Sequence, residues 1–277
     1  MSYFGFLLRF LMIPIVILLG LAWWDTRRGR QAPAVLRSWP MWAAIGLHVL
    51  IALVYTTPWD NYLVATRVWW YDPALVTGIT IGWVPIEEYT FFVLQPILGG
   101  LWLWLLMRHL RLGPARLRRS IRIWPVMLLG ILWLLSVLIL VAGWQPGTYL
   151  ALLLGWALPP IMLQLAFGAD ILWRHGRLVF WTIVPLTLYL SFADALAIDW
   201  GTWTIDPAQS LNVYLGGVLP VEEFIFFLMT NTLITFGTVL VLAEESHQRI
   251  HQIVAKIQRS EETVSRGKNR TSITISE

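Results

Sequence analysis

The sequence predicts an all-α integral membrane protein with seven transmembrane helices, arranged as a parallel 3+1+3 internal repeat. Three observations predict this fold class. The 277 residues are 57% hydrophobic and 13% charged, whereas a soluble domain carries roughly 25% charged residues. The polar residues are clustered between apolar runs of about 20 residues, the length that crosses a bilayer as a helix. Finally, the motif Pro-x-Glu-Glu occurs twice, and internal repeats determine architecture.

Seven apolar runs are long enough to cross a bilayer. We expect spans at Tyr3–Trp24, Trp42–Pro58, Trp83–Met107, Trp124–Trp144, Tyr149–Trp173, Leu178–Ala197 and Val213–Ala243. Tryptophans lie near many of these ends, as is typical of the membrane interface. The last run is longer than a bilayer requires, so we expect it to tilt or protrude. The first run has no evident cleavage site and is predicted to be a retained anchor.

The basic residues predict the orientation in the membrane. Of the 20 Lys and Arg residues, only Arg9 and Arg67 fall on the side of the N-terminus. Because basic loops stay in the cytoplasm, we expect the N-terminus outside and the C-terminus inside a prokaryotic cell membrane. The net charge of +4 is therefore a signal of orientation, and we predict no nucleic-acid partner.

The two Pro-x-Glu-Glu motifs belong to a longer repeat. Residues of the first half recur in the second half at a fixed distance along the chain. One residue inserted in the second half lengthens this distance by one from that point on. The pairs are Asp60 and Asp194, Trp69 and Trp203, Asp72-Pro73 and Asp206-Pro207, and Pro85-Ile86-Glu87-Glu88 and Pro220-Val221-Glu222-Glu223. Spans one to three therefore match spans five to seven, and the fourth span lets both copies face the same way. We expect residues 1–110 and 148–243 to form the two three-helix repeats. Residues 111–147 would form a basic cytoplasmic loop and linker helix, and 244–277 a disordered polar tail.

Each motif places two acids in the first turn of an apolar helix. Proline and glutamate at a helix start are also ordinary capping chemistry, so one motif alone would indicate little. Its recurrence, with a matching upstream Asp and Trp, favours a functional site. The candidate catalytic residues are Glu87, Glu88, Glu222 and Glu223.

Helical spacing places aromatic rings and polar groups beneath these acids, because residues three or four apart share a face. The candidate residues for binding substrate and stabilising a cation are Trp83, Phe91, Phe92, Phe226 and Phe227. The candidate supporting polar residues are Gln95 and Thr230, two turns deeper on these helices, and Asp60 and Asp194, acids near the outer ends of spans two and six. Burial and a like-charged neighbour favour a protonated carboxyl, which can donate a proton, and aromatic faces attract cations. Acids above aromatic rings in a dry pocket suit carbocation chemistry on an alkene.

Other polar residues have simpler interpretations. Asp72 and Asp206 precede proline and are typical of turns. Asp25 and Asp170 lie near basic residues in the sequence, and we expect ion pairs there. His48 is expected to be a packing residue within a span.

In these residues the sequence resembles the integral-membrane, non-flavin lycopene cyclase family of bacteria, archaea and fungi, in its fused tandem form. The resemblance rests on the two motifs and their flanking residues within Asp60–Leu94 and Asp194–Leu228. It implies a lycopene beta-cyclase of carotenoid biosynthesis, which converts the linear ψ-ends of lycopene into β-ionone rings without net redox change. One glutamate would be the acid and a second carboxylate the base, with the assignment open. The implied partners are lycopene, the lipid bilayer and other carotenoid-pathway enzymes.

Some other functions of membrane proteins require a particular residue or motif. A covalent retinal needs a lysine in the last span, but the first lysine is Lys256. A prenyltransferase needs an Asp-rich DDxxD run, and a flavin cyclase needs Gly-x-Gly-x-x-Gly; neither pattern occurs. No His and acid cluster has metal-ligand spacing, so we predict no cofactor and no metal. A proton-coupled transporter that uses the paired glutamates and another carotenoid end-group enzyme, such as a hydratase, remain open.

Overall fold

The structure is a computed structural model that describes residues 1–110, 122–256 and 258. Within them, seven helices are long and apolar enough to cross a membrane. The first is continuous through α1 (Tyr3–Leu7), a π-helical turn η1 (Leu8–Met12) and α2 (Ile13–Arg27). The others are α3 (Met41–Ala65), α4 (Ile86–His109), α5 (Ile123–Val141), α6 (Thr148–Arg174), α7 (Gly176–Asp199) and α8 (Val221–Leu242). The prediction of a mostly helical chain with seven apolar, membrane-length helices is confirmed.

Two helix boundaries differ from the prediction in ways that matter for the site. Helix α3 continues past Pro58 to Ala65, so Asp60 lies inside it rather than beyond its end. The expected start of the last span at Val213 is wrong. Strands β5 (Tyr214–Leu215) and β6 (Leu219–Pro220) form a hairpin before α8 begins. Its turn contains Gly216 and Gly217 with φ of 59° and 77°, a backbone region that glycine adopts without steric cost.

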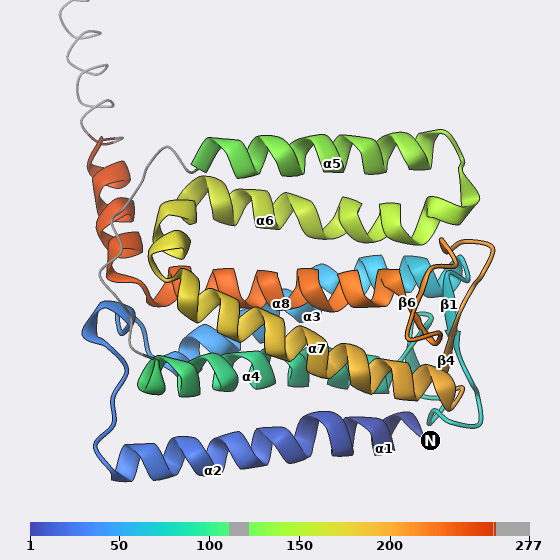
Figure 1. The fold of residues 1–277 in the computed structure, drawn as a ribbon, viewed down its shortest axis with the longest axis horizontal. Helices are drawn as coiled ribbons and strands as arrows, with labels where there is room; N and C mark the ends of the chain where they lie inside the picture. The colour runs from blue at the N-terminus through green and yellow to red at the C-terminus, as the bar shows by residue number, and fades with distance from the viewer. Residues whose placement is uncertain (111–121, 257, 259–277) are drawn as a thin grey trace, which may run out of the picture.

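The helices run side by side, with their connections gathered at two ends (Figure 1). Helices α4 and α8 contact each other and occupy the centre, and each also packs against both α3 and α7. Helix α2 packs on α4 and α6 on α8, whereas α5 lies outside, against α6. The apolar stretch of α4 is 61% buried and that of α8 50%, whereas that of α5 is only 6% buried. Polar side chains are therefore sheltered along α4 and α8.

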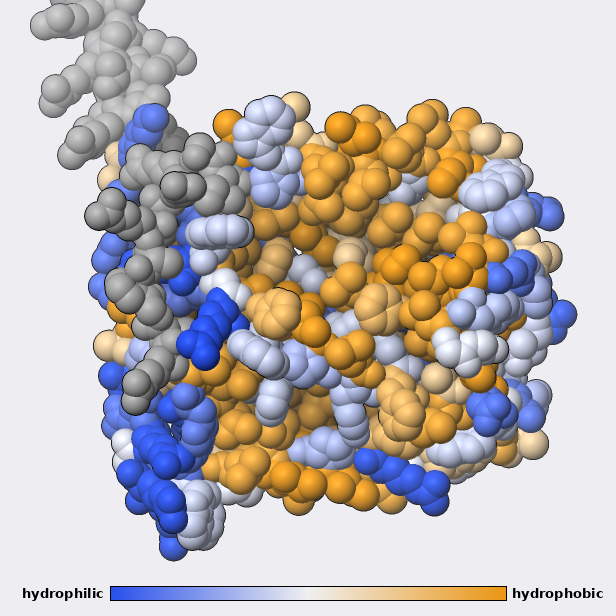
Figure 2. Space-filling model, in the orientation of Figure 1, coloured by the Kyte–Doolittle hydropathy of each residue, from blue (hydrophilic) through white to orange (hydrophobic). Residues whose placement is uncertain are grey.

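The surface matches a membrane location. Figure 2 shows an apolar belt across the middle of the molecule, with hydrophilic residues gathered at both ends. Large apolar side chains such as Leu128, Leu138 and Val141 are exposed on α5. A lipid bilayer accepts such a surface at no cost, because lipid tails are as apolar as these side chains.

Three short sheets cover the end of the bundle where the N-terminus lies (Figure 1). Strand β1 (Trp69–Tyr71) pairs antiparallel with β4 (Trp203–Ile205), and Trp70 and Thr204 form the central pair. Strand β2 (Thr80–Ile81) pairs with β3 (Val84–Pro85), just as β5 pairs with β6. The one residue that is inserted in the second copy of the repeat lies in its hairpin turn, because two residues separate β2 from β3 and three separate β5 from β6.

The opposite end carries the connections from α2 to α3 and from α6 to α7, together with a further helix over 244–256 (Figure 1). Parts of the predicted basic loop and polar tail, at residues 111–121, 257 and 259–277, lie outside the described residues. The expected ion pairs are confirmed here. Asp170 accepts from Arg122 at 2.7 Å and from Arg249 at 2.8 Å, and Asp25 contacts Arg30 and His109.

Candidate active site

The first glutamate of each motif binds the loop in front of its helix. Glu87 Oε1 accepts the backbone N–H of Thr77 at 2.6 Å. Glu222 Oε1 accepts the N–H of Leu211 at 2.7 Å and the hydroxyl of Ser210 at 3.2 Å. Thr77 and Leu211 correspond at the offset that relates the two halves, so both contacts fall at the same place in the repeat. Both glutamates are fully buried.

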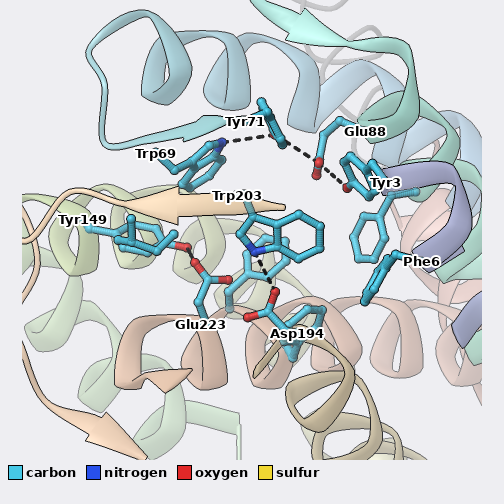
Figure 3. Close-up of a pocket in the computed structure, with 13 residues that line it drawn as sticks. Tyr3, Phe6, Trp69, Tyr71, Glu88, Tyr149, Asp194, Trp203 and Glu223 are labelled. Atoms are coloured by element: carbon cyan, nitrogen blue, oxygen red, sulfur yellow. Dashed lines mark hydrogen bonds between the residues drawn. The ribbon is translucent and has the colours of Figure 1, made fainter. Parts of the chain in front are cut away.

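The second glutamate of each motif points elsewhere, because neighbouring helical residues project about 100° apart. Glu88 Oε2 accepts hydrogen bonds from the phenols of Tyr3 and Tyr71, the latter at 3.0 Å. Glu223 Oε1 accepts from the phenol of Tyr149 at 2.6 Å. Figure 3 shows both carboxyl groups among aromatic rings in one pocket.

This pocket, which we call the central cavity, has a volume of about 50 Å³. Its lining combines three carboxyl groups, nine aromatic side chains and one isoleucine, and it draws on both halves of the chain. The lining residues are Tyr3, Phe6, Trp69, Tyr71, Glu88, Phe91, Tyr149, Asp194, Trp203, Ile205, Glu223, Phe226 and Phe227. Aromatic rings thus surround acids that come from α4, α7 and α8.

Six of the predicted site residues line the central cavity: Glu88, Glu223, Phe91, Phe226, Phe227 and Asp194. The rings of Phe91 and Phe227 lie edge to face, with centroids 6.3 Å apart, and those of Phe226 and Phe227 are 5.2 Å apart. The phenylalanines of α4 and α8 therefore meet below the glutamates.

Other predicted residues lie outside the cavity. Trp83 is not beside the acids, because it occupies the turn between β2 and β3 and is 68% exposed. Phe92 is buried against the ring of Tyr89, at 5.7 Å between centroids. Glu87 and Glu222 face their loops, as described above.

The two aspartates that correspond in the repeat have different surroundings. Asp194 Oδ1 accepts from the indole N–H of Trp203 at 3.1 Å (Figure 3). Asp60 is equally buried, yet neither of its oxygens has a hydrogen-bond partner among the described residues. The indole of Trp69, which corresponds to Trp203, donates instead to the Tyr71 hydroxyl at 3.2 Å.

Tyr71 is the cause of this difference, because the second half has Ile205 at the corresponding position. Burial, followed by the nearby charges of Glu88 and Asp60, raises the pKa of the Tyr71 phenol well above its ordinary value. The phenol therefore keeps its proton and acts as a donor to Glu88. The site is symmetric in its glutamates and asymmetric in what surrounds them.

Below the cavity, a polar contact joins the two central helices. Gln95 of α4 donates from Nε2 to Thr230 Oγ1 of α8 at 2.8 Å. Asn231 lies beside this pair and donates to Thr187 of α7 at 3.2 Å. Hydrogen bonds between helices take the place of the hydrophobic effect inside a membrane, so these residues fix how α4 and α8 meet.

Comparisons with known proteins identify the family. Residues 32–106 and 146–242 match the family model described as Lycopene cyclase. Each matched segment contains one Pro-x-Glu-Glu motif, and α5 falls in the gap between them. This chain belongs to the lycopene cyclase family.

Relatives of this lycopene cyclase family member come from archaea and fungi. The chain is 35% identical over 241 residues to the protein named lycopene beta-cyclase from Halobacterium salinarum, and the match covers 86% of this chain and 95% of that protein. It is 36% identical over 210 residues to the bifunctional lycopene cyclase/phytoene synthase of Podospora anserina, covering 70% of this chain and 34% of that protein. No solved structure matches the chain.

Several lining residues of this lycopene cyclase family member are not predicted from its sequence. Tyr3, Phe6 and Tyr149 lie far from the two motifs along the chain, and Tyr71 and Ile205 precede the Asp-Pro pairs but differ between the two halves. A usable signal exists for two of them, since Tyr3 and Tyr149 are the first residues of the matching spans one and five. Trp69 and Trp203 are visible as repeat partners, but nothing in the sequence places them beside the glutamates.

The remaining sequence expectations for this family member concern turns and packing. Asp72 and Asp206 each accept a backbone N–H two residues on, at 2.9 Å, which confirms them as turn residues. His48 Nδ1 contacts the carbonyl of Ala44 at 2.7 Å inside α3, as expected of a packing residue. Within the described residues, no group of three or more His, Asp or Glu side chains could hold a metal ion.

Proposed function

We propose that this protein is a lycopene beta-cyclase, which closes the linear ψ-ends of lycopene into β-ionone rings by acid and base chemistry. One observation carries the proposal. Glu88 and Glu223 reach the same cavity from opposite halves of the chain, surrounded by nine aromatic side chains. Family membership supports lycopene as the substrate.

The reaction requires one proton donor and one proton acceptor. A protonated carboxyl donates its proton to the terminal double bond and leaves a tertiary cation. The neighbouring alkene attacks this cation, which forms the ring C–C bond and moves the cation to the ring. A carboxylate then removes a ring proton and leaves the ring double bond. One proton enters and one leaves, so the product is an isomer of the substrate.

We assign the two proton transfers to Glu88 and Glu223, one as donor and the other as acceptor. The faces of Phe91, Phe226 and Phe227 would stabilise the cation, by about 0.5–2 kcal/mol for each well-placed ring. Asp194 would hold the Trp203 indole at the cavity wall, 3.1 Å away.

The other predicted site residues have supporting roles in this proposal. Glu87 and Glu222 hold the loops over the cavity, and Gln95 and Thr230 join α4 to α8 beneath it. Asp60 is a buried acid beside this system. We assign Trp83 and Phe92 no contact with the substrate.

The cavity must widen to admit an end group. Its volume is about 50 Å³, whereas pockets for small molecules measure roughly 300–1,000 Å³. Aromatic side chains that fill the cavity would therefore move apart as the substrate enters. The surrounding lipid bilayer would deliver this apolar substrate, alongside other carotenoid-pathway enzymes.

The proposed architecture is a parallel 3+1+3 repeat, with residues 1–110 and 148–243 as the two copies and 111–147 and 244–277 as linker and tail. The register of β1 and β4 supports it, because the central pair, Trp70 and Thr204, joins positions that correspond in the repeat. A two-fold axis along the membrane normal requires such a pairing. We further propose that the cavity end faces outward in a prokaryotic membrane and the end with helix 244–256 faces the cytoplasm.

The test uses purified protein in liposomes that contain lycopene, incubated in deuterated water. We expect cyclic products that differ in composition from lycopene only by one deuterium in place of one hydrogen per ring, because the deuteron added to the double bond stays in the product. Mass spectrometry of the separated carotenoids measures both. Lycopene recovered unchanged from folded protein would contradict the function, and rings without deuterium would contradict the protonation step.

A further inference from the structure

Tyr3 and Tyr149 hold the same place in the two halves, although neither lies near a Pro-x-Glu-Glu motif in the sequence. Each lies at the start of its span, in α1 and α6. The N–H of Tyr3 donates to the carbonyl of Leu75 at 2.8 Å, and the N–H of Tyr149 donates to the carbonyl of Gln209 at 2.9 Å. Leu75 and Gln209 occupy equivalent positions in the repeat, three residues after Asp72 and Asp206, so the two anchors correspond.

The anchoring carbonyls belong to the Asp-Pro turns. The N–H of Leu75 bonds to the carbonyl of Asp72 at 2.9 Å, and the N–H of Gln209 bonds to that of Asp206 at 3.1 Å. Each aspartate side chain closes its own turn by accepting a further N–H. The turns thus fix the positions of Leu75 and Gln209, and the carbonyls of these two residues fix the backbone of Tyr3 and Tyr149.

Each phenol contacts the cavity-facing glutamate of its own half. Tyr3 donates to Glu88 and Tyr149 donates to Glu223, and the two tyrosines are 2% and 1% exposed. Such a bond strengthens when the carboxyl group is ionised, which is the state of the acceptor before its proton transfer and of the donor after it. It also fixes the direction in which the free lone pairs of the carboxylate point.

We propose that Tyr3 and Tyr149 are positioning residues of the cyclase, each of which aims the cavity glutamate of its half at the reacting carbons. This proposal rests on the proposed function. It extends the internal repeat to a tyrosine in each half, which connects the Asp-Pro turn to the reacting carboxyl group.

The surroundings of the two glutamates make the proposal quantitative. Glu88 has a second phenol donor, Tyr71, at 3.0 Å. Among the described residues Tyr149 is the one phenol that donates to Glu223, because Ile205 occupies the position that corresponds to Tyr71. Loss of the Tyr3 hydroxyl therefore leaves Glu88 with one donor, whereas loss of the Tyr149 hydroxyl leaves Glu223 with none from a tyrosine.

The experiment measures kcat and KM for Tyr149→Phe, Tyr3→Phe and the double variant Tyr3→Phe with Tyr71→Phe, per folded protein in lycopene liposomes. We expect kcat to fall about tenfold or more in Tyr149→Phe and in the double variant, and by less in Tyr3→Phe, because only the first two remove every phenol donor from one of the cavity glutamates. KM should stay within about twofold of its original value, since the phenols act on the carboxyl groups and not on substrate affinity.

Tyr189→Phe is the matched control, since its hydroxyl donates to the carbonyl of Phe10 at 3.1 Å, away from the glutamates. Its kcat should equal that of the unaltered enzyme. An unaltered kcat in folded Tyr149→Phe overturns the proposal. A kcat of the double variant equal to that of Tyr3→Phe also overturns it. This second comparison tests the proposal even if Tyr149→Phe does not fold. An unaltered enzyme that fails to convert lycopene contradicts the proposed function instead.

Discussion

At the scale of single residues, the paired glutamates have separate tasks although they are adjacent. The turn of about 100° between neighbouring positions sends Glu87 and Glu222 to backbone N–H groups of the loops and Glu88 and Glu223 to the cavity. In the proposed mechanism the motif needs both acids, because one carboxyl group cannot hold the loop and face the substrate. In this mechanism, holding the loop and transferring the proton are therefore divided between the two residues of each pair.

The first prediction compares glutamine at the four positions. Glu88→Gln and Glu223→Gln should lower kcat by about 10²–10⁴-fold, the usual contribution of a general acid or base. Glu87→Gln and Glu222→Gln should lower it much less, because the amide oxygen still accepts the loop N–H. Rates per folded protein in lycopene liposomes measure this, with thermal unfolding as the control for stability. Equal losses at all four positions would contradict the division of tasks.

The sequence predicts some of these residues and misses others for physical reasons. Recurrence reveals the glutamates and the phenylalanines one turn below them, since helical spacing is fixed once the helix is recognised. Trp83 is misplaced because the helix begins only at Ile86, which leaves the indole in a hairpin turn. Tyr71 is missed because its contact with Glu88 depends on the pairing of β1 with β4, which no local pattern encodes.

At the scale of elements, the end opposite the cavity is held by ion pairs between helices. Asp170 in the last turn of α6 is 1% exposed and binds Arg122, just before α5, and Arg249 of helix 244–256. Two arginines around one buried carboxylate connect three elements. The guanidinium forks donate to both oxygens of Asp170, a geometry that adds strength and direction.

The second prediction concerns this ion-pair cluster. Asp170→Asn should lower the free energy of unfolding by about 1.5–3 kcal/mol, because hydrogen bonds to a charged group are lost, while the two arginines, 24% and 16% exposed, can still reach water. The thermal midpoint of the detergent-solubilised protein measures it. Asp199→Asn is the matched control, as Asp199 is exposed at the end of α7, and its midpoint should not change. A midpoint equally unchanged in Asp170→Asn would show that the cluster adds no stability.

The elements themselves are largely predictable, and their ends less so. Seven long apolar runs predict seven helices, because bilayer thickness fixes the length needed. The hairpin before α8 is missed because Val213–Pro220 is apolar enough to be taken as part of the span. Only the two glycines in its turn indicate otherwise. Helix α3 exceeds its predicted end because Pro58 lies within the helix rather than ending it.

At the scale of the whole molecule, the bundle has two unlike ends. One end carries the cavity, the short sheets and the N-terminus, and the other carries the basic connections and helix 244–256 (Figure 1). Composition alone predicts that the chain crosses a membrane. It does not predict that α4 and α8 occupy the centre, because which helices become neighbours depends on contacts between distant segments.

The third prediction tests the orientation of these two ends. The chain has no cysteine, so single cysteines at exposed alanines can be labelled selectively. Ala74→Cys, at the cavity end, should react with a membrane-impermeant maleimide in intact cells. Ala34→Cys, between α2 and α3, should react only after the membrane is permeabilised. Each variant serves as the control for the other, and the reverse pattern would contradict an outward-facing cavity.

The central cavity takes Glu88 from residues 1–110 and Asp194 and Glu223 from residues 148–243. A second copy of a motif would ordinarily provide redundancy, since one copy could change while the other preserved activity. Here both copies contribute to the same cavity, so neither is a spare. The duplication enlarges the target for inactivating mutations instead of protecting against them, and selection must act on both halves together.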